Sequence, residues 1–177
     1  SERTSDGCIV ATLNYLAQDR PDLLFATKEV SRRMAAPREV DWMLLKRIGR
    51  YLRHAPRACQ VLRWQSMGSM VLTFTDSYWA GCKKTFKSTS AGVVTIGSHT
   101  FKAWSTTQAV LALSSAEAKL YAMIKGASQT LGIMAMAADF GLTVSGRIES
   151  DASAALSIVH RQGLGKLRHI NVQYLWL

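Results

Sequence analysis

The segment Val71-Leu-Thr-Phe-Thr-Asp76 decides the fold class predicted for this chain of 177 residues. Its first five residues are mostly β-branched, aromatic or aliphatic, which favours a strand, and we expect the strand to end at Asp76. A pair of strands is predicted next, over residues 91–97 and 100–104, with the hairpin-like junction Gly97-Ser98-His99 between them. The middle of the chain therefore predicts three strands, the last two joined by a hairpin-like junction.

A long helix is predicted downstream of these strands, from about Ser115 to Asp139, where Gly141 ends it. A short strand over residues 147–150 then runs into Asp151, and further helices are expected over residues 152–159 and from about His169. Strands alternating with helices in this way predict an α/β fold with a mixed sheet flanked by helices. Both aspartates follow a strand, which is where such sheets usually place chemistry.

The first part of the chain has a different pattern, because apolar residues recur at helical spacing between residues 8 and 57. Breaks at Asp19-Arg20-Pro21 and at Ala36-Pro37 divide this region into three expected helices, the second reaching about Met34. We therefore predict a helical segment over residues 1–65 and an α/β domain over residues 66–177.

The charge balance points to an anionic partner. Lys and Arg number 22 against 12 Asp and Glu, a net charge of +10 that is divided about equally between the two parts of the chain. Such an excess favours nucleic acid through phosphate neutralisation, and a merely solvated surface is the alternative. The candidate contacts are two arginines of the third helix and a Lys-Ser-Thr run after the first strand: Arg47, Arg50, Lys83, Lys84, Lys87, Ser88 and Thr89.

Composition excludes several classes of protein. Apolar residues make up 48% and charged residues 19%, which is typical of a globular chain. No apolar run is long enough for a membrane span, and the first residues lack the pattern of a signal peptide. Three widely spaced cysteines indicate neither a zinc site nor a disulfide framework. We therefore expect an intracellular, reducing compartment, either cytoplasm or nucleus, without excluding an organelle.

Several motifs resemble the copia-type long-terminal-repeat retrotransposon polyprotein, in the order found in that family. Segments over residues 14–26, 30–34 and 42–52 resemble the connection that joins its reverse transcriptase to its ribonuclease H. Five further segments resemble motifs of the ribonuclease H domain itself. They are Phe74-Thr-Asp-Ser-Tyr-Trp-Ala-Gly81, Lys87-Ser-Thr-Ser-Ala-Gly92, Ala112-Leu-Ser-Ser-Ala-Glu-Ala-Lys-Leu-Tyr-Ala122, Ser150-Asp-Ala-Ser-Ala-Ala155 and Arg168-His-Ile-Asn-Val172. The resemblance implies a ribonuclease H-like mixed sheet preceded by a helical connection segment.

The resemblance also implies a nuclease that uses Mg²⁺ to cut the RNA strand of an RNA–DNA hybrid. Asp76 matches the first carboxylate of the family and Asp151 the third, and both would bind Mg²⁺ if the domain is active. Asn171 stands where the family usually has a fourth carboxylate. An amide oxygen brings no charge and is a poorer ligand for a hard cation.

The second catalytic position is the one that decides activity. The family has Glu-Ala-Glu where this chain has Glu117-Ala-Lys119. Glu117 lies three residues after Ser114, which is the spacing of a capping box at a helix start. We therefore assign the catalytic position to Lys119, whose ammonium should stabilise Asp76 and Asp151 and exclude Mg²⁺. The alternative is a solvated Lys119 beside an intact set of Asp76, Glu117 and Asp151.

Three functions follow from these assignments. The leading one is a catalytically impaired domain that survives as a module binding RNA–DNA hybrid or other nucleic acid, or as a structural module, without a cofactor. The second is a working Mg²⁺-dependent ribonuclease H that uses Asp76, Glu117 and Asp151, with Asn171 as a weak fourth ligand. The third is a subunit of a larger protein assembly that binds no nucleic acid.

Overall fold

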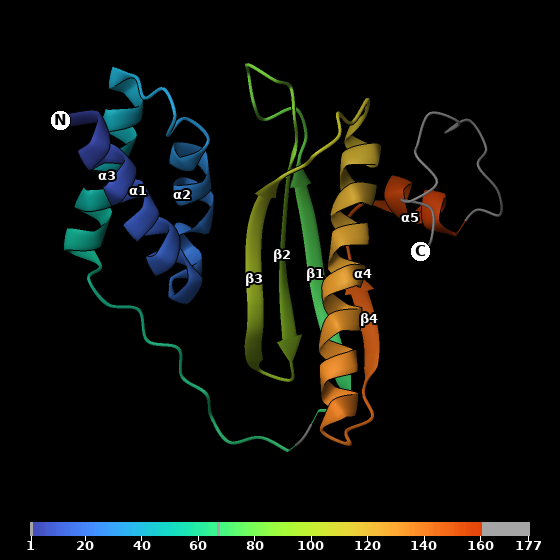
Figure 1. Cartoon of the computed structure of the whole chain (residues 1–177). Helices are drawn as coiled ribbons and strands as arrows, with labels where there is room; N and C mark the ends of the chain where they lie inside the picture. The colour runs from blue at the N-terminus through green and yellow to red at the C-terminus, as the bar shows by residue number, and fades with distance from the viewer. Residues whose placement is uncertain (1, 67, 161–177) are drawn as a thin grey trace. The chain divides into compact units, whose positions relative to one another are not determined.

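The structure is a computed structural model that describes residues 2–66 and 68–160 (Figure 1). The chain divides between Val61 and Leu62 into two compact units, the first helical and the second α/β. None of the described helices is long and apolar enough to cross a lipid bilayer.

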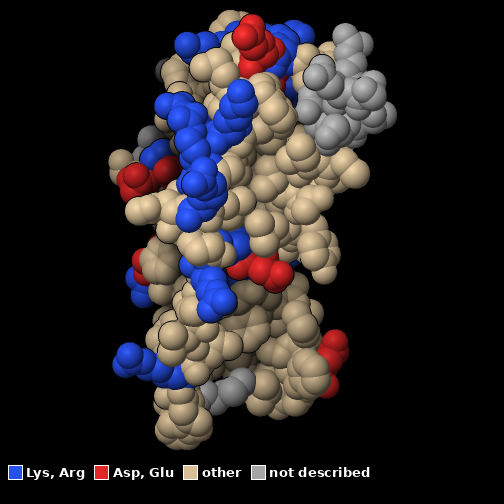
Figure 2. Space-filling view, turned by 90° about the vertical axis from the view of Figure 1, so that its left-hand side faces the viewer, with Lys and Arg blue, Asp and Glu red and all other residues tan. Residues whose placement is uncertain are grey.

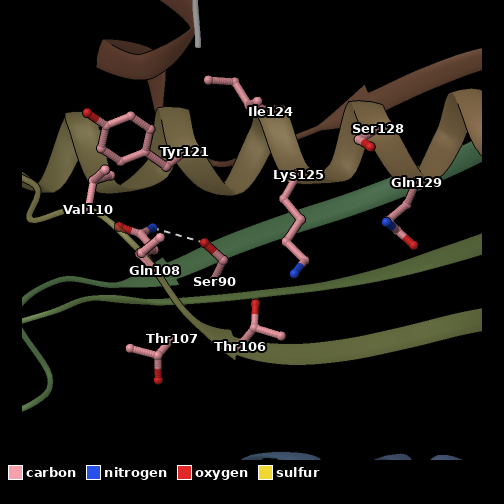
Figure 3. Close-up of a pocket in the computed structure, with 11 residues that line it drawn as sticks. Ser90, Thr106, Thr107, Gln108, Val110, Tyr121, Ile124, Lys125, Ser128 and Gln129 are labelled. Carbon is pink, nitrogen blue, oxygen red and sulfur yellow. Dashed lines mark hydrogen bonds between the residues drawn. The ribbon is translucent and has the colours of Figure 1, made fainter. Parts of the chain in front are cut away.

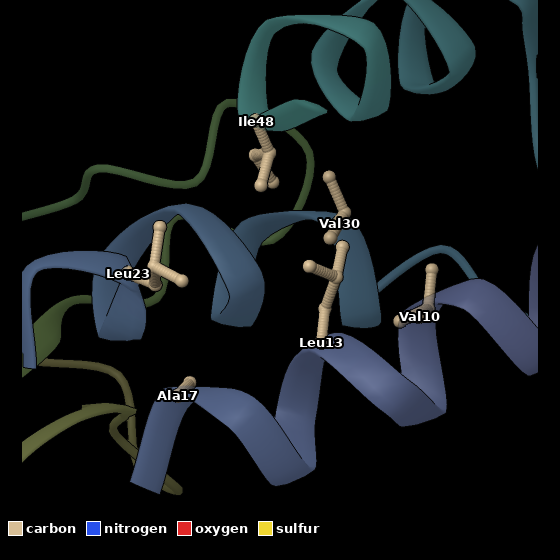
Figure 4. Packing of buried hydrophobic residues seen from close by; sticks show 6 residues of the cluster. All are labelled: Val10, Leu13, Ala17, Leu23, Val30 and Ile48. Carbon is tan, nitrogen blue, oxygen red and sulfur yellow. The ribbon is translucent and has the colours of Figure 1, made fainter. Parts of the chain in front are cut away.

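Three α-helices and a short 3-10 helix make up the first unit: α1 (Glu2–Asp19), η1 (Pro21–Leu23), α2 (Leu24–Ser31) and α3 (Glu39–His54). Pro21 fits the first turn of η1 because its missing N–H would have no partner there. Residues spaced three and four apart on α1 pack against the other helices, as Figure 4 shows. The buried cluster consists of Val10, Leu13, Ala17, Leu23, Val30 and Ile48.

A polar cluster joins the start of η1 to the end of α3. The Arg20 guanidinium donates two hydrogen bonds to the Asp22 carboxylate, at 3.0 and 2.7 Å, and one to the carbonyl of Ala55 at 3.1 Å. The Tyr51 hydroxyl donates to the same carboxylate at 2.8 Å. Hydrogen bonding to Arg20 lowers the pKa of Asp22 to about 2. This cluster holds the junction of α1 and α2 against α3.

The second unit contains a four-stranded mixed sheet in the order β3-β2-β1-β4. Its strands are β1 (Met70–Tyr78), β2 (Thr89–Ile96), β3 (His99–Thr107) and β4 (Ser145–Glu149). β1 is antiparallel to β2 and parallel to β4, and β2 is antiparallel to β3. Two helices complete the described part of the unit, α4 (Ser115–Asp139) and α5 (Ser153–Val159).

Helix α4 covers one face of this sheet. Val71, Thr73 and Thr75 alternate along β1 and are all buried, which is the period-two pattern of a strand packed on one side. The hydroxyls of Thr73 and Thr130 lie 2.6 Å apart, joining β1 to α4. Gly126 allows the helix to approach closely, because a Cβ at this position would overlap the methyl group of Thr75. The predicted α/β class with a mixed sheet is confirmed.

Several predicted element boundaries were wrong. β1 does not end at Asp76 but continues to Tyr78, because Asp76 is still paired with Ala91 of β2. α2 ends at Ser31 and not near Met34, since the following residues change to i→i−3 hydrogen bonds typical of a tight turn. α1 begins at Glu2, before the start of the predicted helical region. The helix expected from about His169 lies outside the described residues.

Candidate functional site

Lys119 lies between the two aspartates that the sequence singled out. Its Nζ donates a hydrogen bond to Oδ1 of Asp151 at 2.5 Å and lies 3.6 Å from Oδ1 of Asp76. Asp76 comes from β1, Lys119 from the second turn of α4, and Asp151 from the segment between β4 and α5. β1 and β4 are parallel neighbours, so their carboxyl ends reach the same edge of the sheet. We call Asp76, Lys119 and Asp151 the Asp–Lys–Asp cluster.

The ammonium is the sheltered member of this cluster. The Lys119 side chain is 19% exposed, whereas those of Asp76 and Asp151 are 69% and 72% exposed. Its stem therefore packs along the protein surface while its charge reaches the carboxylates. The cluster is an open surface site, and its formal charge is −1, from two carboxylates and one ammonium.

The proton equilibria of the cluster reflect these contacts. The hydrogen bond to Asp151, followed by the attraction of both carboxylates, raises the pKa of Lys119 above 10.5. The same hydrogen bond and the charge of Lys119 lower the pKa of Asp151 below 3.8. Lys119 and Asp151 are therefore both ionised at neutral pH, and the cation in the cluster is permanent.

Glu117 has a different position, at the start of α4. Its side chain is almost fully buried, with 2% of the residue exposed. Its Oε2 accepts from the Leu113 N–H at 2.9 Å, and its Oε1 accepts from the Tyr121 hydroxyl at 2.6 Å. The Glu117 N–H donates to Oγ of Ser114 at 3.2 Å. These contacts are those of a capping residue that orders the first turn of the helix.

The donor set does not fit a divalent cation. Mg²⁺ prefers several oxygen ligands in octahedral geometry, and the cluster offers two carboxylates with an ammonium in contact with both. No group of three or more His, Cys, Asp or Glu side chains that could hold a metal ion occurs within residues 2–66 and 68–160. Asn171, the expected fourth position, lies outside the described residues.

The predicted lysine run lies in the connection between β1 and β2. Lys83 and Lys84 are exposed and Lys87 is partly exposed, so their ammonium groups are available to a phosphate backbone. The expectation for Ser88 and Thr89 was wrong, because both residues are buried. Oγ of Ser88 instead accepts a hydrogen bond from the Ala80 N–H at 3.0 Å, which holds the connection closed.

The predicted arginines lie on α3 in the helical unit. Arg47 and Arg50 are exposed, together with Lys46 and Arg53 on the same helix. Lys46 also lies over the ring of Trp42, 5.6 Å from its centroid. Figure 2 shows Lys and Arg side chains gathered in a band on one face, with separate patches of acidic side chains at its edges. This surface fits an anionic partner.

Sequence reasoning missed two residues that organise the α4 region. Tyr121 supports Glu117, and the four-residue spacing between them was the available signal. Gln108, which follows β3, is buried and donates from Nε2 to Oγ of Ser90 at 2.9 Å and to the carbonyl of Ala118 at 2.8 Å. No local pattern marks Gln108, because its partners come from distant parts of the chain.

Comparison with known proteins identifies relatives from Arabidopsis thaliana, two of which come from transposons. The chain is 31% identical over 137 residues to the retrovirus-related Pol polyproteins from transposons RE2 and RE1. It is 32% identical over 121 residues to an uncharacterized mitochondrial protein of the same plant. The first two matches cover 77% of this chain but 9% of each polyprotein, and the third covers 68% of this chain and 50% of that protein.

No family model and no solved structure matches the chain. The assignment therefore rests on the two polyproteins, whose match covers 77% of this chain. The chain belongs to the copia-type retrotransposon Pol polyproteins.

Proposed function

We propose that residues 66–177 form a ribonuclease H-like domain that has lost metal-dependent cleavage and acts by binding nucleic acid. The preceding helical unit is, in this proposal, the connection segment from a reverse transcriptase. The strand order β3-β2-β1-β4, with one helix inserted before β4, is compatible with a ribonuclease H-like sheet. Asp76 of β1 and Asp151, which follows β4, lie at the same edge of this sheet, as the resemblance to the family requires.

The observation that carries the proposal is the contact of Lys119 with both aspartates. A two-metal nuclease site gathers negative charge, and four carboxylates would supply about four negative charges to two divalent ions. Here an ammonium held on α4 contacts the carboxylates at 2.5 and 3.6 Å. A metal ion entering between them would have to displace a fixed positive charge and would meet repulsion from it.

Glu117 does not favour the alternative of a working ribonuclease H. Its two carboxylate oxygens serve the Leu113 N–H and the Tyr121 hydroxyl, and the residue is buried. Recruiting Glu117 as a metal ligand would leave a buried donor unpaired at the start of α4. The geometry therefore supports Lys119, and not Glu117, as the residue at the second catalytic position.

Cleavage of a labelled RNA–DNA hybrid in Mg²⁺ or Mn²⁺ tests the loss of activity. The full chain should show no hybrid-specific cleavage, and Lys119→Glu combined with Asn171→Asp should recover it. Adding Asp76→Asn to the double variant should abolish the recovered activity. Arg147→Glu makes the same charge change as Lys119→Glu at an exposed position and should recover nothing.

Cleavage by the unmodified chain that disappears in Asp76→Asn would overturn this part of the proposal. If that cleavage also disappears in Glu117→Gln while Lys119→Gln retains it, the working enzyme with Asp76, Glu117 and Asp151 is the correct assignment.

Nucleic-acid binding is tested separately by fluorescence anisotropy with the same hybrid. The net charge of +10 and the exposed lysines predict an affinity that falls steeply as salt rises. Replacing Lys83 and Lys84 together by Gln should flatten the salt dependence by up to about two phosphate contacts. No binding at low salt would instead favour a structural subunit of a protein assembly.

A further inference from the structure

The β1–β2 connection, residues 79–88, carries an exposed phenylalanine on a strained backbone. Phe86 has a φ of +52° and is 62% exposed. In the part of the chain that the structure describes, Phe86 and Ala80, with a φ of +49°, are the residues other than glycine that have a positive φ. A bulky side chain disfavours this left-handed conformation, which glycine and asparagine adopt more readily. Neither backbone geometry nor burial therefore explains a phenylalanine at position 86.

Hydrogen bonds within the β1–β2 connection hold this conformation. The Phe86 N–H donates to the carbonyl of Cys82 at 2.7 Å, and the Cys82 N–H donates to the carbonyl of Lys87 at 3.2 Å. The Ala80 N–H donates to Oγ of the buried Ser88 at 3.0 Å. Strained residues persist where surrounding contacts fix them in this way, and they cluster at active sites and at sites that bind ligands. The ring of Phe86 is therefore presented to solvent by an ordered segment of backbone.

Positive charge surrounds Phe86 in the sequence. Residues 79–88 contain three lysines, Lys83, Lys84 and Lys87, and no Asp or Glu. None of these lysines forms an ion pair with an acidic side chain among the described residues. An exposed aromatic ring beside ammonium groups is the combination that binds the bases and phosphates of a nucleic-acid strand. The charge of the β1–β2 connection is therefore complementary to such a strand.

The β1–β2 connection is separate from the cavity of the same domain. This cavity of about 600 Å³ lies between α4 and the strands β2 and β3, and Lys125 is among its lining residues (Figure 3). None of residues 79–88 lines the cavity. A ligand stacked on Phe86 would therefore lie on an exposed surface, as a nucleic-acid strand does, and outside this cavity.

We propose that the β1–β2 connection binds an unpaired nucleotide, whose base stacks on the ring of Phe86 and whose phosphates contact the three lysines. This inference rests on the proposed binding of nucleic acid by residues 66–177, and it adds a preference for single-stranded segments. The bases of a duplex are already paired and stacked, whereas unpaired bases can stack on an aromatic side chain. Such stacking adds affinity with little selection for sequence, since every base has a flat face.

Fluorescence anisotropy with the full chain and three labelled probes tests the inference. The probes are a thymidine decamer, a decamer of abasic sites with the same number of phosphates, and a blunt-ended RNA–DNA hybrid. Phe86→Ala should weaken binding of the thymidine decamer about tenfold, because one stacked base is lost. The same substitution should change the affinity for the abasic decamer and for the hybrid by no more than about twofold, and Phe86→Tyr should keep the affinity for the thymidine decamer.

Phe140→Ala is the matched control. Phe140 is 76% exposed in the same domain, but its φ is an ordinary −87° and it follows Asp139. Its removal should change the affinity for the thymidine decamer by no more than about twofold. Phe86→Gly should bind the decamer as weakly as Phe86→Ala but should melt at a higher temperature, because glycine adopts a positive φ without strain. This comparison separates the role of the ring from that of the backbone.

Two results would overturn the inference and leave the proposed binding of nucleic acid in place. One is an equal effect of Phe86→Ala and Phe140→Ala on the thymidine decamer, and the other is an equal effect of Phe86→Ala on the decamer and the hybrid. Failure of the chain to bind any of the three probes would overturn both. Poly-glutamate binding that depends on Phe86 more strongly than decamer binding does would assign the connection to an acidic protein and would also overturn the inference.

Discussion

Lys119 and Glu117 lie two positions apart on α4 and have different roles. Lys119 contacts the two aspartates, and Glu117 caps the start of the helix. Successive residues are about 100° apart around an α-helix, so residues two positions apart point in very different directions. Lys119 faces the aspartates at the sheet edge, and Glu117 turns back into the capping contacts at the helix start. In the proposed assignment, a Glu-to-Lys exchange at position 119 would change the charge of the site without disturbing the capping contacts of Glu117.

The pKa of Asp151 offers a direct test at the residue scale. NMR titration of its carboxyl should give a pKa below 3.8, and Lys119→Gln should return it toward that value because the hydrogen bond and the positive charge are lost. Lys125→Gln removes another lysine from the same helix and should leave the Asp151 titration unchanged. An Asp151 pKa that is the same with and without Lys119 would show that the contact is not formed in solution.

The sign of the pH dependence follows from these shifts. Asp151 has a lowered pKa in the folded state, so its contribution to stability is present above pH 3.8 and is lost as pH falls through the lower value. Lys119 has a raised pKa, so its contribution is present below pH 10.5 and is lost as pH rises through the raised value. Lys119→Gln should therefore reduce stability between these limits, and the effect should shrink as pH falls through the lowered pKa of Asp151.

The resemblance to the family, and not spacing alone, predicted that Asp76, Lys119 and Asp151 belong to one site, because aspartates near strand ends are common. Spacing could not establish that Ser88 is buried, since its partner Ala80 is set by the path of the β1–β2 connection. It also gave no sign of the cavity at Lys125, which depends on the pairing of Ser90 with Thr106 under α4. Local patterns predict elements, whereas cavities depend on how elements pack.

At the scale of elements, the strands extended beyond the predicted limits. The hydrophobic run of β1 stops before Asp76, but hydrogen bonds to β2 carry the strand on to Tyr78. The backbone of β1 stays paired with β2 beyond the end of the apolar side-chain pattern, so the strand continues through the exposed Asp76. The bounds of α4 were predicted correctly, because Ser114 and Gly141 mark both of its ends.

Close packing within the sheet gives a prediction for Gly92. A Cβ at this position would overlap the ring of Trp104 and would lie 2.8 Å from the carbonyl oxygen of Phe74. Because the backbone oxygen cannot rotate away, Gly92→Ala should lower the free energy of unfolding by about 1–3 kcal/mol. Chemical denaturation followed by circular dichroism measures this change.

Gly132 provides the matched control. It lies on α4 with nothing within 4 Å of an added Cβ. Gly132→Ala should increase stability by about 0.5–1 kcal/mol, because alanine is the better helix former. Equal effects of the two substitutions would contradict the packing described for β2.

At the scale of the whole molecule, the two units have separate hydrophobic cores. The segment between α3 and β1 has no regular structure over residues 55–66, and its last part is tied to the β2–β3 hairpin. His99 contacts the carbonyl of Arg63 at 2.6 Å, and Gln65 donates to the carbonyl of Ile96 at 2.9 Å. The contacts of the connection with the β2–β3 hairpin therefore begin at Arg63, and we expect the backbone before Arg63 to be the more mobile part.

Limited trypsin digestion tests this organisation. Cleavage should occur after Arg57 before it occurs after Arg63, since a protease must bind an extended, mobile backbone. The two products should then resist further digestion, because each unit retains its own core. Mass spectrometry of the early products identifies the sites, and first cleavage inside α3 or β1 would contradict the division.

Binding of Mn²⁺ to the full chain, followed by electron paramagnetic resonance, tests the central claim most directly, namely that the Lys119 ammonium takes the position of a metal ion. The unmodified chain should leave the signal of free Mn²⁺ unchanged, and Lys119→Glu should bind Mn²⁺ in a manner lost on adding Asp76→Asn. Stoichiometric binding by the unmodified chain that is abolished by Asp76→Asn or Asp151→Asn would contradict the account.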